Sequence, residues 1–284
     1  MKFRPLASLA LSTVLFTPAA GLRAQAPELP AWQQVRDVPR GVVQRLEYQS
    51  KSIGKAREAL VYLPPGYDGG TDRYPVLYLL HGAGGDERVW NERMQANVIL
   101  DNLIADGELD PLVVIMPHGF TNRMPNDERP RAAGAYKAEM EEFAADFVGD
   151  LVPLVESRYR VVADRAHRAI AGNSMGGGQA LRLGLTHPEM FSSVASFSAA
   201  MQIANSAAWG GIDMDAALAN ADALNELDML WVGCGAEDRL FGVNKRFSDQ
   251  LTAAGVEHTF RVTLGAHVPA VWSRYLHEVA PQLF

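Results

Sequence analysis

The sequence has little of three things that often dominate a protein's chemistry: cysteine, excess positive charge and long apolar runs. One cysteine among 284 residues cannot form a disulfide within the chain, and one thiol without a matching cluster of cysteine and histidine is no metal framework. With 26 basic and 33 acidic side chains the net charge is −7, and no cluster of lysine and arginine offers a stripe for a phosphate backbone. The sequence therefore argues against a disulfide-held fold, a resident metal and a nucleic-acid partner.

What the chain does have is the composition of a packed globular domain. Apolar residues make up 48% and charged residues 21%, which excludes the low-hydrophobicity, high-charge profile of a disordered protein. A length of 284 residues suits one large domain or two small ones. No internal repeat, low-complexity tract or linker divides residues 42–284. We expect one domain there, preceded by an N-terminal extension over residues 27–41.

Residues 1–26 have the features of a secretory signal peptide. Two basic residues precede an apolar core at residues 6–16, and small residues follow it. This core is shorter than the roughly 20 residues needed to span a bilayer, so we expect cleavage rather than a membrane anchor. Cleavage is expected near Ala26, with Gly21 and Ala24 as alternative sites. The processed protein would then be secreted or periplasmic, with no stable membrane span.

From residue 42 onward the chain alternates strand-like and helix-like segments, which indicates an α/β fold with a mostly parallel central sheet flanked by helices. The first two expected strands, at residues 42–48 and 58–63, are predicted to form an antiparallel pair. Continuous apolar runs at residues 75–80 and 112–116 are typical of central strands buried on both faces. Weaker strands are expected at 169–171, 194–197 and 229–232, and amphipathic helices at 94–104 and 136–159.

The most informative motif is Gly172-Asn173-Ser174-Met175-Gly176, which lies between an expected strand and an expected helix. A sharp turn there forces a strained backbone at the serine, and the two glycines remove side chains that would clash. The serine would stand at the carboxyl end of the sheet, beside the free amide groups of a helix N-terminus. We therefore predict that Ser174 is a catalytic nucleophile.

A serine nucleophile needs a general base, and the base needs an orienting acid, in the chain order serine, acid, histidine for hydrolases of this shape. Of the four histidines after Ser174, His267 alone lies in a loop after a strand and a glycine, so it is the predicted base. Asp238 is the first choice for the acid, and Glu237 stays open. Asp238 also suits the N-cap of the helix that follows. Cys234, in the preceding strand, is interpreted as a buried apolar residue.

The oxyanion that forms during acyl transfer needs two preorganised donors. The backbone N–H of Met175, directly after the serine, is one expected donor. The second is expected from Gly82 or Ala83, in the loop after the strand that ends at Leu80. His81, in the same loop, is interpreted as a residue that braces the loop rather than as a catalytic base.

Five ordered motifs carry a resemblance to a known family: Val-Tyr-Leu-Pro-Pro-Gly-Tyr at 61–67, Tyr-Pro-Val-Leu-Tyr-Leu-Leu-His-Gly at 74–82, Gly-Asn-Ser-Met-Gly-Gly at 172–177, His-Pro-Glu-Met-Phe at 187–191, and Gly-Ala-His at 265–267 with Trp272. Together they resemble the α/β-hydrolase esterases, in the branch that holds feruloyl and acetylxylan esterases, enterochelin esterases and S-formylglutathione hydrolases. The similarity runs from about Glu58 to about Trp272.

The resemblance implies an α/β-hydrolase fold, a triad of Ser174, Asp238 and His267, hydrolysis of carboxylic esters through an acyl-enzyme, and no cofactor. Asn173 and Ala266 depart from the residues common in relatives, and neither departure removes a catalytic group.

Fewer residues bear on the substrate. Arg123 and Trp209 lie in segments that follow strand ends, and Trp272 follows the histidine motif, so these three are expected at the ester site. For the arginine, a solvated loop charge is the alternative. Export favours an ester outside the cytoplasm, such as a feruloyl or acetyl group on plant polysaccharide. The alternatives are a siderophore-ester hydrolase, a sugar acyltransferase and, outside enzymes, a catalytically silent binding module.

Overall fold

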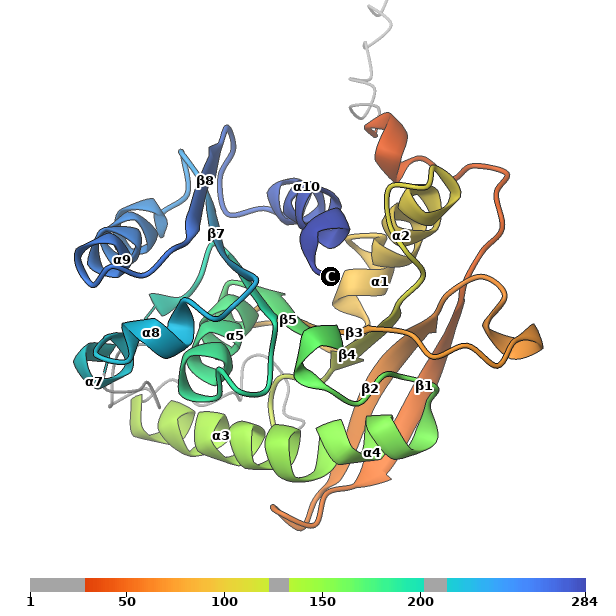
Figure 1. Ribbon diagram of the computed structural model, residues 1–284, viewed down its shortest axis with the longest axis horizontal. Helices are drawn as coiled ribbons and strands as arrows, with labels where there is room; N and C mark the ends of the chain where they lie inside the picture. The colour runs from red at the N-terminus through yellow and green to blue at the C-terminus, as the bar shows by residue number, and fades with distance from the viewer. Residues whose placement is uncertain (1–28, 123–132, 202–213) are drawn as a thin grey trace, which may run out of the picture.

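The computed structural model describes residues 29–122, 133–201 and 214–284 (Figure 1). The expected signal peptide lies outside the described residues, and so do Arg123 and Trp209, two of the three residues expected at the ester site. Trp272 and all the residues expected to act in catalysis are described.

An eight-stranded sheet forms the centre of the molecule, in the order β1-β2-β4-β3-β5-β6-β7-β8. β1 pairs antiparallel with β2 and β2 antiparallel with β4, whereas all the other pairs are parallel. The strands are β1 (Val42–Gln49), β2 (Ala56–Leu63), β3 (Val76–Leu80), β4 (Val113–Pro117), β5 (Arg168–Asn173), β6 (Ser193–Phe197), β7 (Met229–Gly235) and β8 (Thr259–Thr263). The antiparallel start and the parallel centre confirm the α/β-hydrolase fold.

Two layers of helices cover the sheet. α1 (Val89–Glu92), α2 (Ala96–Ala105) and α10 (Pro269–Val279) pack on one face. The other face carries α3 (Ala133–Asp146), α4 (Val152–Arg158), α5 (Met175–Thr186) and α9 (Phe241–Ala253), with the short α7 (Met214–Leu218) and α8 (Ala221–Leu224) at its edge. Side chains of β3 alternate between the two cores, which explains why its sequence is continuously apolar.

The helix expected over residues 136–159 is interrupted, which corrects the prediction of one continuous helix. α3 ends at Asp146, a π-helical turn covers Phe147–Leu151, and α4 continues from Val152. Pro153, near the start of α4, has no N–H to donate to the preceding turn, so the regular hydrogen-bond ladder cannot pass through it.

The described part of the N-terminal extension packs against the domain. Trp32 stacks on His277 of α10 with 4.8 Å between ring centroids, and Gln33 Nε2 donates to the carbonyl of Met94 at 3.2 Å. Arg36 pairs with Asp106 just beyond α2. These contacts tie residues 31–36 to the helices beside the cavity described below.

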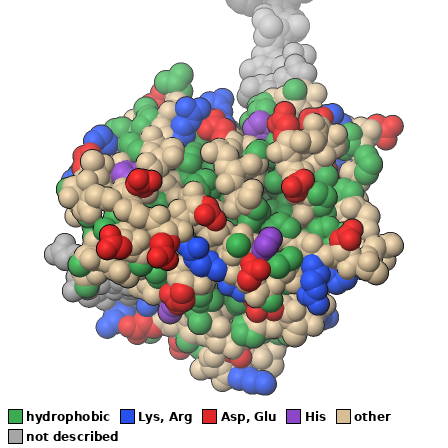
Figure 2. All heavy atoms as spheres, viewed as in Figure 1, with side chains coloured by type: hydrophobic (Ala, Val, Ile, Leu, Met, Phe, Trp, Pro, Cys, Tyr) green, Lys and Arg blue, Asp and Glu red, His purple; other side chains and the backbone are tan. Residues whose placement is uncertain are grey.

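Figure 2 shows one face of the molecule, on which acidic and basic side chains are interspersed rather than gathered by sign. Across the described residues, the structure has no helix that is both long enough and apolar enough to cross a membrane.

Candidate active site

Ser174 occupies a strained turn between β5 and α5. Its φ is +54° and its ψ is −112°, a backbone conformation that non-glycine residues rarely adopt. Three hydrogen bonds hold it there: its N–H donates to Phe197 O at 2.8 Å, and its carbonyl accepts from Gly178 N–H at 3.0 Å and from Ala200 N–H at 2.8 Å. The surrounding backbone therefore fixes the conformation that directs the Ser174 side chain out of the sheet.

The two motif glycines allow the close packing that this turn requires. A Cβ on Gly172 would lie 2.5 Å from the carbonyl oxygen of Gly176, and a Cβ on Gly176 would lie 2.4 Å from that of Leu80. Both approaches involve backbone atoms, which cannot move aside as a flexible side chain could. Any larger residue at either position would displace Ser174.

His267 joins Ser174 to Asp238 in a chain of hydrogen bonds. His267 Nε2 lies 2.9 Å from Ser174 Oγ, and Nδ1 lies 2.8 Å from Asp238 Oδ2. Because an ionised carboxylate can only accept, Nδ1 carries the proton of the neutral ring and the Nε2 lone pair faces the serine hydroxyl. The Asp238 side chain is fully buried, while that of His267 retains 15% exposure. The structure thus brings the three predicted triad residues together.

Between the two candidate acids, the structure places Asp238 and not Glu237 against His267. Asp238 is buried and Glu237 is exposed. The second oxygen of Asp238, Oδ1, accepts the Leu240 N–H at 2.8 Å just before α9 begins. The N-cap of α9 is Leu240, not Asp238 as the alternative interpretation would have it, so the Asp238 carboxylate orients the histidine and also binds the backbone N–H of the residue at the helix start.

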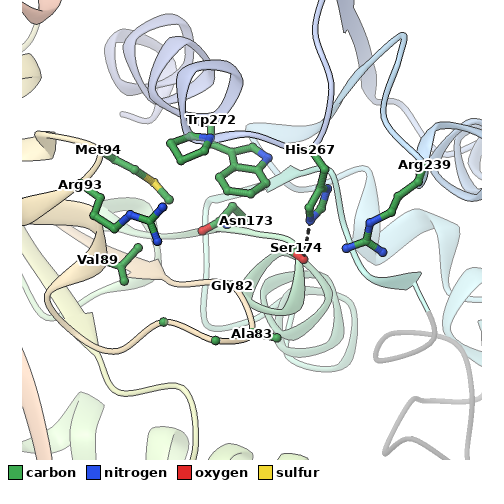
Figure 3. A pocket seen from close by; sticks show the side chains of 13 residues that line it. Gly82, Ala83, Val89, Arg93, Met94, Asn173, Ser174, Arg239, His267 and Trp272 are labelled. Atoms are coloured by element: carbon green, nitrogen blue, oxygen red, sulfur yellow. Dashed lines mark hydrogen bonds between the residues drawn. The ribbon is translucent and has the colours of Figure 1, made fainter. Parts of the chain in front are cut away.

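A cavity of about 420 Å³ opens onto Ser174 and His267 (Figure 3). Val89, Met94 and Trp272 give it an apolar wall, and the glycine-rich loop over residues 82–85 also lines it, next to Val89. The ring of Trp272 meets that of His267 edge-to-face at 4.8 Å. Trp272, expected at the ester site, therefore lines the cavity beside the histidine.

The segments expected to supply oxyanion donors lie beside Ser174. Gly82 and Ala83 line the cavity, and a Cβ on Gly82 would lie 3.2 Å from Ser174 Cβ. Met175 follows the serine directly as the first residue of α5. This position places its backbone N–H at a helix N-terminus, where it has no partner within the helix.

His81 braces this loop, as expected from the sequence. Its Nδ1 lies 2.8 Å from Gly82 O, and its Nε2 accepts the Gly119 N–H at 2.8 Å. Nδ1 is therefore the protonated nitrogen and donates to Gly82 O. Because a peptide unit is planar and trans, holding the Gly82 carbonyl also sets the direction of the Ala83 N–H on the opposite side of the same unit.

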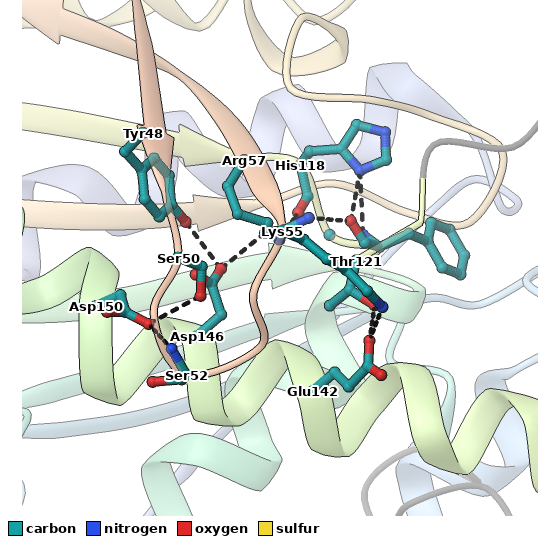
Figure 4. A network of polar contacts seen from close by, with 12 residues as sticks. Tyr48, Ser50, Ser52, Lys55, Arg57, His118, Thr121, Glu142, Asp146 and Asp150 are labelled. Atoms are coloured by element: carbon teal, nitrogen blue, oxygen red, sulfur yellow. Dashed lines mark hydrogen bonds and ion pairs between the residues drawn. The ribbon is translucent and has the colours of Figure 1, made fainter.

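A buried network holds the loop after β4, where Gly119 lies (Figure 4). Arg57 of β2 donates from Nη2 to His118 O at 2.7 Å and from Nη1 to Phe120 O. Its Nε pairs with Asp146 of α3 at 2.9 Å, and these two side chains are 3% and 1% exposed. Sequence reasoning missed this network. Arg57 lies just before the strand expected at residues 58–63, and no short-range pattern marked it as buried.

Cys234 is buried in β7, as predicted. Burial, and then the nearby charge of Asp238, raise the pKa of its thiol to about 12. At neutral pH the side chain is therefore a protonated thiol with little nucleophilic character. Among the residues that the structure describes, no group of three or more histidine, cysteine, aspartate or glutamate side chains is placed to hold a metal ion.

Comparison with known proteins places the chain in a family. The model of the family described as "Putative esterase" matches residues 50–283. An endo-1,4-beta-xylanase/feruloyl esterase of Xylanibacter ruminicola is 34% identical over 270 residues, covering 93% of this chain and 34% of that protein. The iron(III) enterobactin esterase of Escherichia coli is 28% identical over 177 residues, covering 61% of this chain and 40% of that protein. This chain thus spans only about a third of the length of the xylanase relative.

Solved structures agree with the sequence match. A ferulic acid esterase superposes with a TM-score of 0.71 at 28% identity, covering 85% of this chain and 97% of that one. A ferulic acid esterase of Anaeromyces mucronatus, determined in complex with ferulic acid, gives a TM-score of 0.72 at 22% identity, covering 90% and 97% of the two chains, and supports the fold. The family match extends from the loop after β1 almost to the C-terminus, and the chain therefore belongs to the esterase family that this model describes.

Proposed function

We propose that the protein is a serine esterase that hydrolyses carboxylic esters through an acyl-enzyme on Ser174. The hydrogen-bonded chain of Ser174, His267 and Asp238, opening onto a cavity of about 420 Å³, is the observation that carries this proposal. The roles within that chain follow from its geometry.

The first half of the reaction acylates the serine. Ser174 Oγ attacks the ester carbonyl carbon while His267 Nε2 takes the hydroxyl proton, and the carbonyl oxygen becomes an oxyanion beside the N–H groups of Met175 and Ala83. When the tetrahedral intermediate collapses, the bond to the alcohol oxygen breaks and His267 returns the proton to that oxygen. Asp238 holds the imidazole in place and stabilises its cationic form.

The second half releases the acid. Water loses a proton to His267 Nε2 as its oxygen attacks the acyl carbon, and a second tetrahedral intermediate forms. Its collapse breaks the bond to Ser174 Oγ, which takes the proton from His267. The products are the alcohol and the carboxylic acid, and the triad returns to its starting state.

For the substrate we propose a feruloyl or acetyl ester on plant polysaccharide, hydrolysed outside the cytoplasm. The apolar wall of Val89, Met94 and Trp272 suits an aromatic or short acyl group. The names of the Xylanibacter ruminicola relative and of the Anaeromyces mucronatus structure support a feruloyl group. The predicted signal peptide at residues 1–26 supports export, and N-terminal sequencing of protein recovered outside the cytoplasm tests it.

A fluorophosphonate probe and two substitutions test the reaction. We expect an adduct on Ser174 in the native protein. Ser174→Ala and His267→Ala should each lower kcat by about 10⁴- to 10⁶-fold without changing the circular dichroism spectrum. Ser157→Ala, at an exposed position of α4, is the control that should keep full activity. No adduct on Ser174 would favour a catalytically silent module, and an active His267→Ala protein would refute the base assignment.

Two further substitutions test the acid. Asp238→Asn should lower kcat by about 10⁴-fold, because the amide can favour the wrong histidine tautomer, whereas Glu237→Gln should stay near the native rate. The reverse ranking would move the acid role to Glu237.

Substrate comparison separates the related activities. The purified protein is assayed on methyl ferulate, acetylated xylan, a catecholate siderophore ester and short-chain aryl esters. We expect the highest kcat/KM on the feruloyl or acetyl substrates; preference for the siderophore ester would overturn the polysaccharide assignment. Product analysis with and without a sugar acceptor distinguishes transfer to water from transfer to a sugar.

A further inference from the structure

Among the described residues, the cavity that opens onto Ser174 is lined by two arginines and by no aspartate or glutamate. Arg93, just after α1, and Arg239, just before α9, are both exposed, and their guanidinium groups project into the cavity from opposite sides (Figure 3). This lining is positive in a chain whose net charge is −7.

Several arginines elsewhere in the described residues pair with a carboxylate, whereas neither cavity arginine has an ion pair or a side-chain hydrogen bond to a described residue. Arg88, five residues before Arg93, pairs with Asp86 at 2.6 Å. The other paired arginines include Arg36, Arg45, Arg57, Arg168 and Arg261. Two like charges on one cavity repel each other, and an anionic group bound between them would offset that repulsion.

The reaction assigns the two arginines to different parts of an ester. The alcohol oxygen must lie within hydrogen-bond reach of His267 Nε2, because that nitrogen protonates it. Arg239 projects from the His267 side of the cavity, whereas Arg93 lies with Val89 and Met94 on the other side. A group on the alcohol part of the substrate therefore meets Arg239 first.

We propose that this cavity selects esters that carry a carboxylate, with Arg239 binding a carboxylate on the alcohol part and Arg93 adding positive potential from the opposite wall. The guanidinium fork matches the two oxygens of a carboxylate. If the substrate is an acylated polysaccharide, the carboxylate would come from uronic acid residues in the sugar chain that carries the ester. The inference rests on the proposed esterase function and adds a substrate class to it.

A matched pair of substrates tests the inference: 4-acetoxybenzoate, which carries its carboxylate on the alcohol part, and its neutral methyl ester, assayed for release of acetate. The measured quantity is the ratio of kcat/KM for the anionic ester to kcat/KM for the neutral one. Arg239→Gln should lower this ratio by about tenfold and Arg93→Gln by about threefold, both through KM. Arg246→Gln, which removes an exposed positive charge from α9 outside the cavity lining, should leave the ratio unchanged.

Salt gives an independent readout. Raising the salt concentration from about 0.01 to about 0.3 M should lower the ratio for the native protein, because salt screens exposed charges. A variant that carries both Arg93→Gln and Arg239→Gln should keep its ratio unchanged. Equal ratios in the native, Arg239→Gln and Arg93→Gln proteins would overturn the inference and show that both arginines are only solvated. If the native protein hydrolyses neither of these esters nor methyl ferulate, the esterase proposal itself fails.

Discussion

His81 offers a direct test of how the cavity loop is held. His81→Phe keeps an aromatic ring of similar size but removes both nitrogens, and with them the hydrogen bond to Gly82 O and the acceptor for the Gly119 N–H. Gly82 O keeps a second donor, the N–H of Gly85 at 3.1 Å. The substitution therefore leaves one buried donor without its partner, the N–H of Gly119, and leaves the direction of the Ala83 N–H held only through the Gly85 hydrogen bond.

These two consequences have different sizes and different readouts. One orphaned buried N–H costs about 1–3 kcal/mol in the free energy of unfolding, which thermal denaturation measures. Losing an oxyanion donor outright costs about 10²–10³ in kcat. Because His81 only orients the loop, we expect a smaller loss, about 10- to 100-fold in kcat. KM should change little, since the donor acts on charge that forms in the transition state.

His81→Asn separates orientation of the loop from stability. An asparagine amide nitrogen can take the place of Nδ1 and donate to Gly82 O, but its side chain is too short to replace Nε2 as the acceptor for Gly119. We expect this variant to lose about as much stability as His81→Phe while recovering most of the kcat. Ester hydrolysis is measured on the same substrate for both variants. Equal kcat in the two variants would refute the role assigned to the Gly82 hydrogen bond.

Two other substitutions or treatments probe the buried polar groups. Arg57→Met should lower the free energy of unfolding, measured by urea denaturation, by about 3–5 kcal/mol, because it leaves the Asp146 carboxylate buried without its cation. Combining Arg57→Met with Asp146→Leu should regain much of that loss. If the second substitution recovers no stability, this reasoning is refuted. Cys234 should resist alkylation by iodoacetamide at pH 8 in the folded protein, because its raised pKa of about 12 keeps the thiol protonated and burial keeps it inaccessible. Labelling should become rapid in denaturant, where the pKa returns towards its ordinary value, and rapid labelling of the native protein would contradict the buried position.

Local sequence predicted the sheet and the serine turn well, because their physical requirements are short-range. Residues 75–80 are apolar throughout, and β3 is buried on both faces. The glycines around Ser174 predict close backbone packing, and the structure shows where the neighbouring carbonyl oxygens lie. Each of these features depends on a few adjacent residues, so it can be recognised from a single sequence.

Features that join distant segments could not be predicted in the same way. Arg57 pairs with a carboxylate 89 residues away, and the sequence around either residue does not predict which residue is its partner. Arg93 and Arg239 lie in separate loops, and only the fold brings them to one cavity. The π-helical turn before Pro153 is an intermediate case, since the proline was visible but the regular apolar spacing around it favoured one continuous helix.

Asp238 shows that a functional role and a structural role for one residue of the active site need not exclude each other. An N-terminal helix contact and a catalytic acid are usually weighed as competing interpretations of one aspartate, yet a carboxylate has two oxygens. Here Oδ1 accepts the Leu240 N–H, and this bond restricts rotation of the carboxylate so that Oδ2 stays directed at His267 Nδ1. The contact at the start of α9 is therefore part of what orients the proposed general base, since an acid free to rotate would hold the imidazole less firmly.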